Sequence, residues 1–273
     1  MKVRISFSRP IIKYAFWILA VTLLIHHAET HAQQGAVRPT SIDLRPNFEK
    51  FGLTPRVQGK RGTCSVFAIT QAIEFALAKQ GGRIDRLSLE FLNWASNEAA
   101  GDTLDGSFFS DLWTGFTKHG ICVEKEMPYR SKFDARIQPS ATALEDAKTR
   151  LEAGLRLHWI KEWDPNRGLT DIELQAVLQT LSEGWPVSGG FLWPKKAVWT
   201  DGILEMCPRD HVFDGHSLLI VGYRDDPNKP GGGVLLIRNS GGTSRDGYLT
   251  YEYAKAYMND AVWIDFENPS MED

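Results

Sequence analysis

The spacing of apolar residues changes along this chain, and the first clear pattern is helical. Over residues 63–80, apolar side chains recur three and four positions apart, which predicts a buried helix of about four turns. Gly81 and Gly82 end it, because glycine adopts the left-handed conformation at a helix C-terminus without a Cβ penalty. Thr170 and Glu173 form a capping box in front of another apolar repeat. Further helices are predicted over residues 87–99, 108–118 and 171–184.

Beyond Gly184 the apolar residues gather in short runs instead. These runs are rich in β-branched and aromatic side chains, and Gly, Pro, Asp and Asn separate them, which is typical of strands with tight connections. A helix-rich half followed by a strand-rich half predicts an α+β fold, not alternating βαβ units. The predicted strands are residues 186–192, 217–223, 234–238, 247–251 and 261–266. Residues 130–168 show no clear pattern.

The first 32 residues differ in kind from the rest. Basic residues precede an apolar run over residues 15–25, and Ala28 and Ala32 follow it, which is the order of a secretory signal peptide. The run is shorter than the roughly 20 residues that a membrane-spanning helix needs, so an uncleaved anchor is the weaker interpretation. We expect export, to the periplasm or out of the cell, with cleavage near Ala32. Contact with a membrane is expected only through this segment, where it stays uncleaved.

Charge and cysteine usage exclude several classes of function. The whole chain has 31 Lys and Arg against 34 Asp and Glu; without residues 1–32 it keeps 27 and 33, a net charge of -6. An acidic protein is poorly suited to grip phosphate backbones, so no nucleic-acid partner is expected. Three cysteines without a C-x-x-C pair are too few for a disulfide scaffold or a zinc ribbon. Any cysteine chemistry must come from single residues.

Three residues that lie far apart in the sequence form a candidate catalytic set. Cys64 starts the first predicted helix, where the positive end of the helix dipole favours the reactive thiolate. His216 stands at the mouth of one predicted strand, and Asn239 follows the end of the next. This arrangement fits a nucleophile, a base and a group that orients the base. Each residue also has an ordinary interpretation, as a buried free thiol, a structural histidine and a turn residue.

With these residues in place, the chain resembles the papain-like cysteine peptidases. Gln58 stands six residues before Cys64, which is the family spacing. The resemblance covers about residues 40–265 and is weakest over 130–168. It implies a helical subdomain over residues 33–150, a β-barrel-like subdomain over 151–273, and an active-site cleft between them. The matching segments are residues 43–45, 53–59, 87–92, 105–109, 120–121, 127–129, 185–188, 201–203, 216–223 and 238–240.

The resemblance implies a cysteine-type peptidase and a role for each site residue. A Cys64 thiolate paired with a protonated His216 would attack a peptide carbonyl and form a thioester, which water then hydrolyses. Asn239 would hold the imidazole. Gln58 and the backbone N–H of Cys64 would form the oxyanion hole. No metal or other cofactor is expected.

The implied substrate is a peptide or protein in extended conformation. Gly106 and Ser107 would bind its backbone as an added strand. Asp214 would make the main side-chain pocket tolerant of basic residues. A long inhibitory pro-segment is not expected, which leaves a separate inhibitor protein as an open alternative. The residues that would border the main pocket are Phe109, Gly190, Asp214 and Ser217.

The chain departs from the family pattern at four positions. Ser65 and Gly241 stand where the family has Trp. The second of these tryptophans shields the bond between the histidine and the asparagine from water, so its loss is expected to weaken that bond. Arg61 and Leu104 stand where the family has two cysteines that form a disulfide. Both are missing together, as expected where the disulfide has been dispensed with.

Several alternatives stay open. A protein that keeps the papain-like fold but binds peptides with weak or no catalysis fits the missing tryptophans. A Cys-His amidase or acyltransferase would use the same nucleophile. Cys122 and Cys207 form either one disulfide or two free thiols. A zinc site is a further candidate, with the ligand set Cys207, His211 and His216 beside Asp210 and Asp214.

Overall fold

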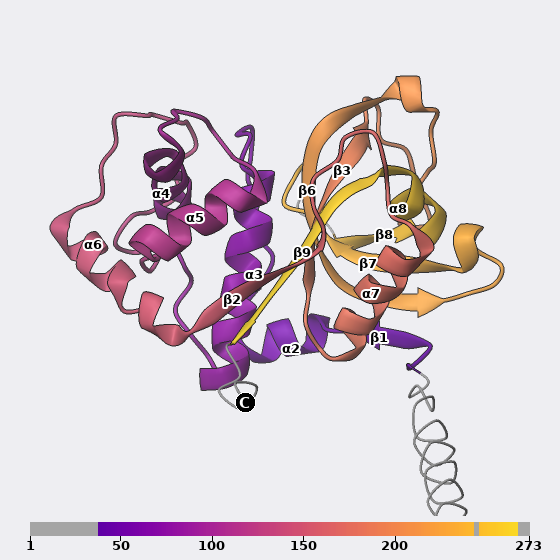
Figure 1. Cartoon of the computed structure of the whole chain (residues 1–273), viewed down its shortest axis with the longest axis horizontal. Coiled ribbons are helices and arrows are strands. Elements are labelled where there is room, and N and C mark those ends of the chain that lie inside the picture. The colour runs from indigo at the N-terminus through magenta and orange to yellow at the C-terminus, as the bar shows by residue number, and fades with distance from the viewer. Residues whose placement is uncertain (1–37, 243–245, 267–273) are drawn as a thin grey trace, which may run out of the picture. The chain divides into compact units, whose positions relative to one another are not determined.

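The computed structural model describes residues 38–242 and 246–266, so the predicted signal peptide lies outside the described residues. Beyond Arg38, the described residues belong to one compact unit. The helices of residues 64–148 gather on one side of this unit, and a nine-stranded sheet lies on the other together with the helices of residues 171–182 and 251–257 (Figure 1). The predicted α+β fold is confirmed. Among the described residues, no helix combines the length and apolar character that crossing a membrane requires.

The helices predicted from apolar spacing are all present. The first is α3 (Cys64–Gly81), which ends at Gly82 with φ of 83°. The capping box is present too, because the Thr170 hydroxyl accepts from the backbone of Glu173 while the Glu173 carboxylate accepts from the backbone of Thr170. The other predicted helices are α4 (Leu89–Ala100), α5 (Phe109–His119) and α7 (Asp171–Ser182). The structure adds α2 (Arg45–Lys50), α6 (Ala141–Lys148) and α8 (Tyr251–Tyr257).

The strands form one mixed sheet in the order β2-β9-β3-β6-β7-β8-β5-β4, with β1 paired to β6. All of these pairs are antiparallel except β5 with β8. The predicted strands appear as β3 (Val187–Pro194), β6 (Val212–Asp225), β7 (Gly233–Arg238), β8 (Asp246–Thr250) and β9 (Met258–Phe266). The strands not predicted are β1 (Ser41–Asp43), β2 (Leu155–Lys161), β4 (Trp199–Thr200) and β5 (Ile203–Leu204).

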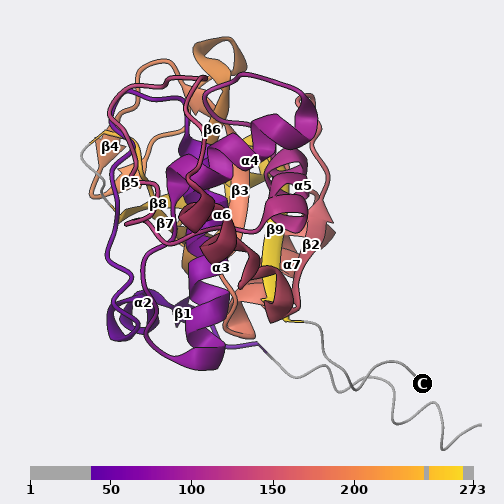
Figure 2. The same cartoon turned by 90° about the vertical axis from the view of Figure 1, so that its left-hand side faces the viewer.

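Helix α3 is the element that joins the two halves. It is buried over nearly its whole length and packs against β3, β6 and β9 as well as α4 and α5. Viewed from the helical side, α4, α5 and α6 lie in front of the sheet (Figure 2). Phe67 and Ile73 of α3 share one hydrophobic core with Ile220 of β6 and Val262 of β9. The N-terminus of α3 is therefore fixed against the sheet.

Candidate active site

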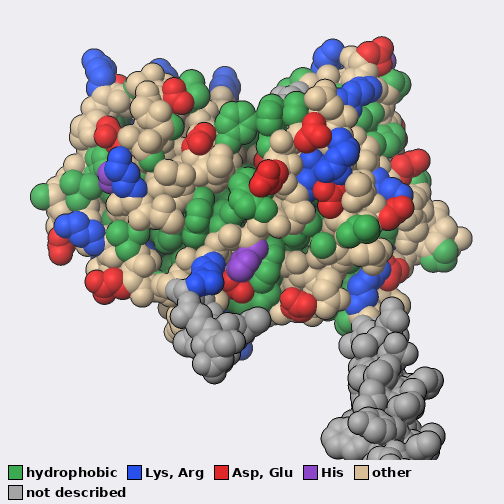
Figure 3. Space-filling model, viewed as in Figure 1, with side chains coloured by type: hydrophobic (Ala, Val, Ile, Leu, Met, Phe, Trp, Pro, Cys, Tyr) green, Lys and Arg blue, Asp and Glu red, His purple; other side chains and the backbone are tan. Residues whose placement is uncertain are grey.

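A cavity of about 360 Å³, here called the catalytic cavity, opens between the start of α3, the segment around residues 102–111 and strands β3, β6 and β9. The surface is hollowed between the two lobes at the top of Figure 3. Cys64 and His216 both line this cavity. Four of the predicted substrate-binding residues line it as well: Ser107, Phe109, Gly190 and Ser217.

Antiparallel pairing of neighbouring strands brings His216 and Asn239 side by side. His216 lies in β6 opposite Phe191 of β3, and Asn239 directly follows β7, the other neighbour of β6. The Nε2 of His216 donates to the Oδ1 of Asn239 over 3.0 Å, and the same oxygen accepts from the backbone N–H of Gly241 over 2.8 Å. With the proton on Nε2, the Nδ1 of a neutral imidazole carries the lone pair and can act as the base.

Cys64 is the first residue of α3, as predicted, but its surroundings oppose the predicted thiolate. Its side chain is buried, and the Sγ donates to the carbonyl oxygen of Gly215 over 3.6 Å. Burial raises the pKa of the Cys64 thiol, and this effect outweighs hydrogen bonds from Ser217 and Ser65 that lower it. Desolvation thus opposes the thiolate that the helix N-terminus favours, and the predicted reactive thiolate stays a prediction.

Burial acts on His216 in the complementary direction. It lowers the pKa of the imidazole, while the hydrogen bond to Asn239 raises it by a smaller amount. Both shifts favour the uncharged forms of the two residues, a thiol and a neutral imidazole. Attraction between a thiolate and an imidazolium would oppose both shifts, so the predicted pair stays a prediction.

Gln58 is held by hydrogen bonds at both ends of its side-chain amide. The Nε2 donates to the carbonyl oxygen of Arg61 over 2.8 Å, and the Oε1 accepts from the hydroxyl of Ser240 over 2.7 Å. Its backbone N–H also donates to the carbonyl of Ser240. Because an amide nitrogen carries two hydrogens and the bond to Arg61 uses one, the second can serve a ligand. The residue after Asn239 thus anchors the predicted oxyanion-hole side chain.

Comparison with known proteins decides the family. Residues 38–262 match the family model described as papain family cysteine protease. The chain belongs to this family. Its relatives include an uncharacterized peptidase C1-like protein of Acanthamoeba polyphaga mimivirus, with 23% identity over 80% of this chain and 71% of that protein. Bovine pro-cathepsin H is 26% identical over 85% of this chain and 65% of its own length.

Solved structures agree with this assignment. Xylellain, a cysteine protease from Xylella fastidiosa, superposes with a TM-score of 0.64 and 25% identity. The match covers 85% of this chain and 88% of the xylellain chain. The papain-like fold predicted from the sequence is therefore confirmed for this papain-family protein.

The loop around Gly106 supports the catalytic cavity from outside its lining. Gly106 has a φ of 99°, and a Cβ there would lie 2.2 Å from the carbonyl oxygen of Gly62, so only glycine fits. Its N–H donates to Asn93 over 2.8 Å. Ser107 does line the cavity, and its N–H donates to the hydroxyl of Ser65 over 3.4 Å. Ser65, at a position where the family has Trp, thus joins helix α3 to the loop around Gly106.

Arg61 joins the same two segments through charge. Its guanidinium is buried, lies 2.5 Å from the carboxylate of Glu90 and 2.8 Å from that of Asp105, and also donates to the carbonyl of Arg130. It packs over the ring of Tyr129 at 4.6 Å. Arg61 occupies one cysteine position of the family disulfide, and Asp105 directly follows the other. An ion-pair cluster thus occupies the place of that covalent link.

Several residues of the catalytic cavity were not predicted. Phe108 and Trp163 are both exposed, and their rings meet edge to face at 5.3 Å. Three carboxylates also line the cavity: Asp102, Asp111 and Asp260. Phe108 and Phe109 stand side by side shortly after Gly106 in the sequence, which is a visible signal for Phe108. The position of Trp163 depends on long-range packing, so no local signal marks it. The side chain of Asp214, the acid predicted here, lies outside what the structure describes.

Two further alternatives from the sequence concern a disulfide between Cys122 and Cys207 and a metal site. Cys122 and Cys207 are free thiols, so the disulfide alternative was wrong. Cys122 is buried in the small core between α4 and α6, whereas Cys207 packs against the main core. Within the described parts of the chain, no three His, Cys, Asp or Glu side chains gather closely enough to hold a metal ion.

Proposed function

We propose that this papain-family protein hydrolyses peptide bonds, with Cys64 as the nucleophile and His216 as its acid–base partner. The observation that carries the proposal is the hydrogen bond from His216 to Asn239. It leaves Nδ1 as the base on a ring that lines the same cavity as the buried thiol. A nucleophile, a base and a group that orients the base are the parts that acyl transfer through a thioester needs.

The proposed steps begin with proton transfer within the Cys64–His216 pair. His216 Nδ1 takes the thiol proton, and the Sγ thiolate attacks the substrate carbonyl. Hydrogen bonds from the Gln58 side chain and the Cys64 backbone stabilise the oxyanion. The imidazolium then protonates the leaving nitrogen, and the C–N bond breaks to give a thioester. Water, activated by His216, hydrolyses the thioester and restores the thiol.

The charges of the catalytic cavity favour peptides that place a basic side chain in this cavity. Three carboxylates line it, and the described lining contains no Lys or Arg. A Lys or Arg of the substrate gains attraction there, whereas an acidic residue is repelled. We expect faster cleavage of peptides that have Arg, rather than Leu, as the residue whose side chain enters the catalytic cavity. The predicted role of Asp214 in the same preference stays a prediction.

The direct test compares the protein with Cys64→Ala on fluorogenic peptide amides and casein. Loss of hydrolysis to background is expected, because no other group supplies the thioester. Cys207→Ala is the matched control, since it removes a free thiol outside the catalytic cavity. Hydrolysis that survives in Cys64→Ala would overturn the assignment of the nucleophile.

A binding module without efficient catalysis is the second candidate, because Ser65 and Gly241 stand where the family has Trp. Alkylation by iodoacetamide as a function of pH separates the two when paired with the hydrolysis assay. A peptidase-type ion pair predicts alkylation that persists well below the ordinary thiol pKa of about 8.5, together with peptide hydrolysis. Alkylation that appears only near that pH, with no hydrolysis, supports the binding module.

We also propose that the chain is exported and cleaved near Ala32. The support is the order of basic residues, apolar run and small residues in the first 32 positions. N-terminal sequencing of the protein recovered from its native location tests this. A mature N-terminus at or close to residue 33 is expected, and an intact Met1 would contradict cleavage.

A further inference from the structure

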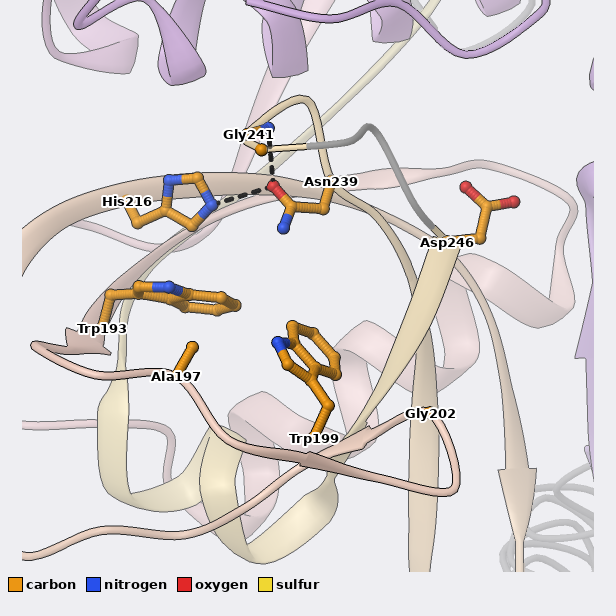
Figure 4. Close-up of a pocket in the computed structure, with 9 residues that line it drawn as sticks. Trp193, Ala197, Trp199, Gly202, His216, Asn239, Gly241 and Asp246 are labelled. Carbon is orange, nitrogen blue, oxygen red and sulfur yellow. Dashed lines mark hydrogen bonds between the residues drawn. The ribbon is translucent and has the colours of Figure 1, made fainter. Parts of the chain in front are cut away.

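An aromatic side chain, Trp193, packs beneath the imidazole of His216. Trp193 lies near the end of β3 and is buried, with 8% of its surface exposed. The centres of the two rings are 4.5 Å apart, and their planes are tilted by 61°. Figure 4 shows the indole edge-on below the imidazole, so the face of the indole is turned toward one edge of the His216 ring.

The pairing of β3 with β6 places Trp193 at this position. Phe191 pairs with His216, and Trp193 follows Phe191 by two residues, so both side chains point to the same face of β3. Tyr253 of α8 packs against Trp193, with ring centres 6.4 Å apart, and its hydroxyl donates to the carbonyl oxygen of Leu192 over 2.8 Å. The indole is therefore held in place by a strand and by a helix.

The contact with Trp193 leaves the proposed base free. Nε2 of His216 donates to Asn239, and Nδ1 lies on the edge of the ring that is turned away from Trp193 (Figure 4). The edge that meets Trp193 carries C–H. Aromatic edges are positive and aromatic faces are negative, so this contact is attractive. It becomes stronger when the imidazole is protonated, because an indole face attracts cations.

A cavity of about 600 Å³ borders both His216 and Asn239, so their hydrogen bond needs cover. Gly241 lines the same cavity and has no side chain to supply that cover. A Cβ there would lie 3.2 Å from Oδ1 of Asn239 and 3.3 Å from Cε1 of His216, so a larger residue would pack against both groups. Trp193 lines the cavity as well. The aromatic support of the imidazole thus comes from β3, and not from position 241, where the family has Trp.

From this geometry we infer that Trp193 is a positioning residue for the reaction. It fixes the plane of the His216 ring, and it stabilises the imidazolium that forms when His216 takes a proton from the thiol or from water. The inference rests on the proposed peptidase function. A contact that is stronger for the imidazolium than for the neutral ring lowers the barrier, because it acts on the state in which charge develops.

Two replacements separate an aromatic role from a packing role. Trp193→Phe and Trp193→Leu both fill part of the space with an apolar side chain, but Phe keeps an aromatic face and Leu does not. Peptide methyl esters are suitable substrates, because methanol is too small a leaving group for its lost contacts to explain a change. Trp193→Leu is expected to lower kcat about tenfold with little change in KM, and Trp193→Phe is expected to recover most of that loss. Trp193→Met is a second variant without an aromatic face, for use where Trp193→Leu fails to fold.

The matched control is Trp159→Leu. Trp159 is 39% exposed and lines neither the 600 Å³ cavity nor the catalytic cavity, so the same change there is expected to keep kcat. All these variants retain the other titratable groups that border the two cavities with His216, which are Cys64, Asp102, Asp111, Asp246 and Asp260.

The pKa of His216 is a readout that a packing role would not lower. It is measured by NMR in the full chain carrying Cys64→Ala, which removes the titrating thiol beside the ring. Loss of the aromatic face disfavours the charged imidazolium, so Trp193→Leu is expected to lower this pKa. Trp193→Phe is expected to keep it close to that of the Cys64→Ala protein.

The two measurements can fail separately. Equal kcat values for Trp193→Phe and Trp193→Leu, with no fall in the pKa of His216, would overturn the inference and leave the peptidase function standing. A rise of this pKa in Trp193→Leu would overturn it too, because Trp193 would then act by keeping water from the ring. Absence of hydrolysis by the unaltered protein would refute the peptidase function itself. A lower kcat and a lower pKa in Trp193→Leu, both recovered in Trp193→Phe, support the inference.

Discussion

Replacement of Arg61 by Met tests how strongly its ion pairs with Glu90 and Asp105 stabilise the segment before Cys64. Met keeps much of the length of the side chain and removes its charge. The change leaves Glu90 and Asp105 without the guanidinium that now lies 2.5 and 2.8 Å from them, and their side chains are only 4% and 22% exposed. Removing one partner of a buried ion pair costs about 3–5 kcal/mol, because the charge left behind stays buried. The partial exposure of Asp105 places the expected loss near the lower end, at about 3 kcal/mol.

Urea unfolding near neutral pH, followed by tryptophan fluorescence, measures this loss. Arg136→Met is the matched control, because Arg136 forms a similar ion pair with Asp134 but its side chain is 89% exposed. An exposed pair contributes little, so the control is expected to keep the unfolding midpoint of the unaltered protein. Arg61→Lys keeps the charge without the planar fork and should fall between the two. A loss for Arg61→Met no larger than that for Arg136→Met would refute a stabilising role of the ion-pair cluster around Arg61.

Three further changes test other parts of the site. Asn239→Ala removes the hydrogen bond that raises the pKa of His216, so the acid limb of the kcat/KM profile, already below 6.5 through burial, moves to still lower pH; a shift to higher pH would contradict this sign. Asp111→Asn is expected to reduce the preference for Arg over Leu peptides two- to threefold at low salt and less at high salt, where screening is stronger; a preference independent of salt in both proteins would count against an electrostatic origin. Gly106→Ala should lower the thermal midpoint more than Gly59→Ala, because both glycines have positive φ but a Cβ meets a backbone carbonyl only at Gly106; equal losses would mean that φ alone sets the cost.

The predicted elements are those whose signal is local. The three- and four-residue spacing over 63–80 fixes α3, and the Thr170 capping box fixes the start of α7. Strand β2 was missed although Leu155 and Leu157 alternate with polar residues, because so short a run does not by itself fix a strand and its partner β9 lies about a hundred residues later. Helix α8 was missed in part because the strand predicted over residues 247–251 runs on past Thr250, whose hydroxyl instead caps the helix by accepting from Tyr253.

The candidate site shows the same division between local and long-range information. Cys64, His216 and Asn239 could be named because each borders a predicted element and matches an ordered motif, although His216 lies inside the longer β6 of the structure. The direction of the pKa shifts at Cys64 and His216 could not be predicted, because it depends on how deeply the folded chain buries them. The cavity of about 600 Å³ lined by Trp193, Trp199 and His216 could not be predicted either, because β3, β4, β6 and the segment after β7 bring its lining together.

The ion-pair cluster around Arg61 has a consequence for the redox conditions in which the site can work. A catalytic thiol is lost when it is oxidised, so such a site benefits from reducing surroundings. A disulfide three residues before the nucleophile is a link that a sufficiently strong reductant can break. Here all three cysteines are free, and charge holds the loop. Reductant can therefore keep Cys64 as a thiol without loosening the segment that positions it.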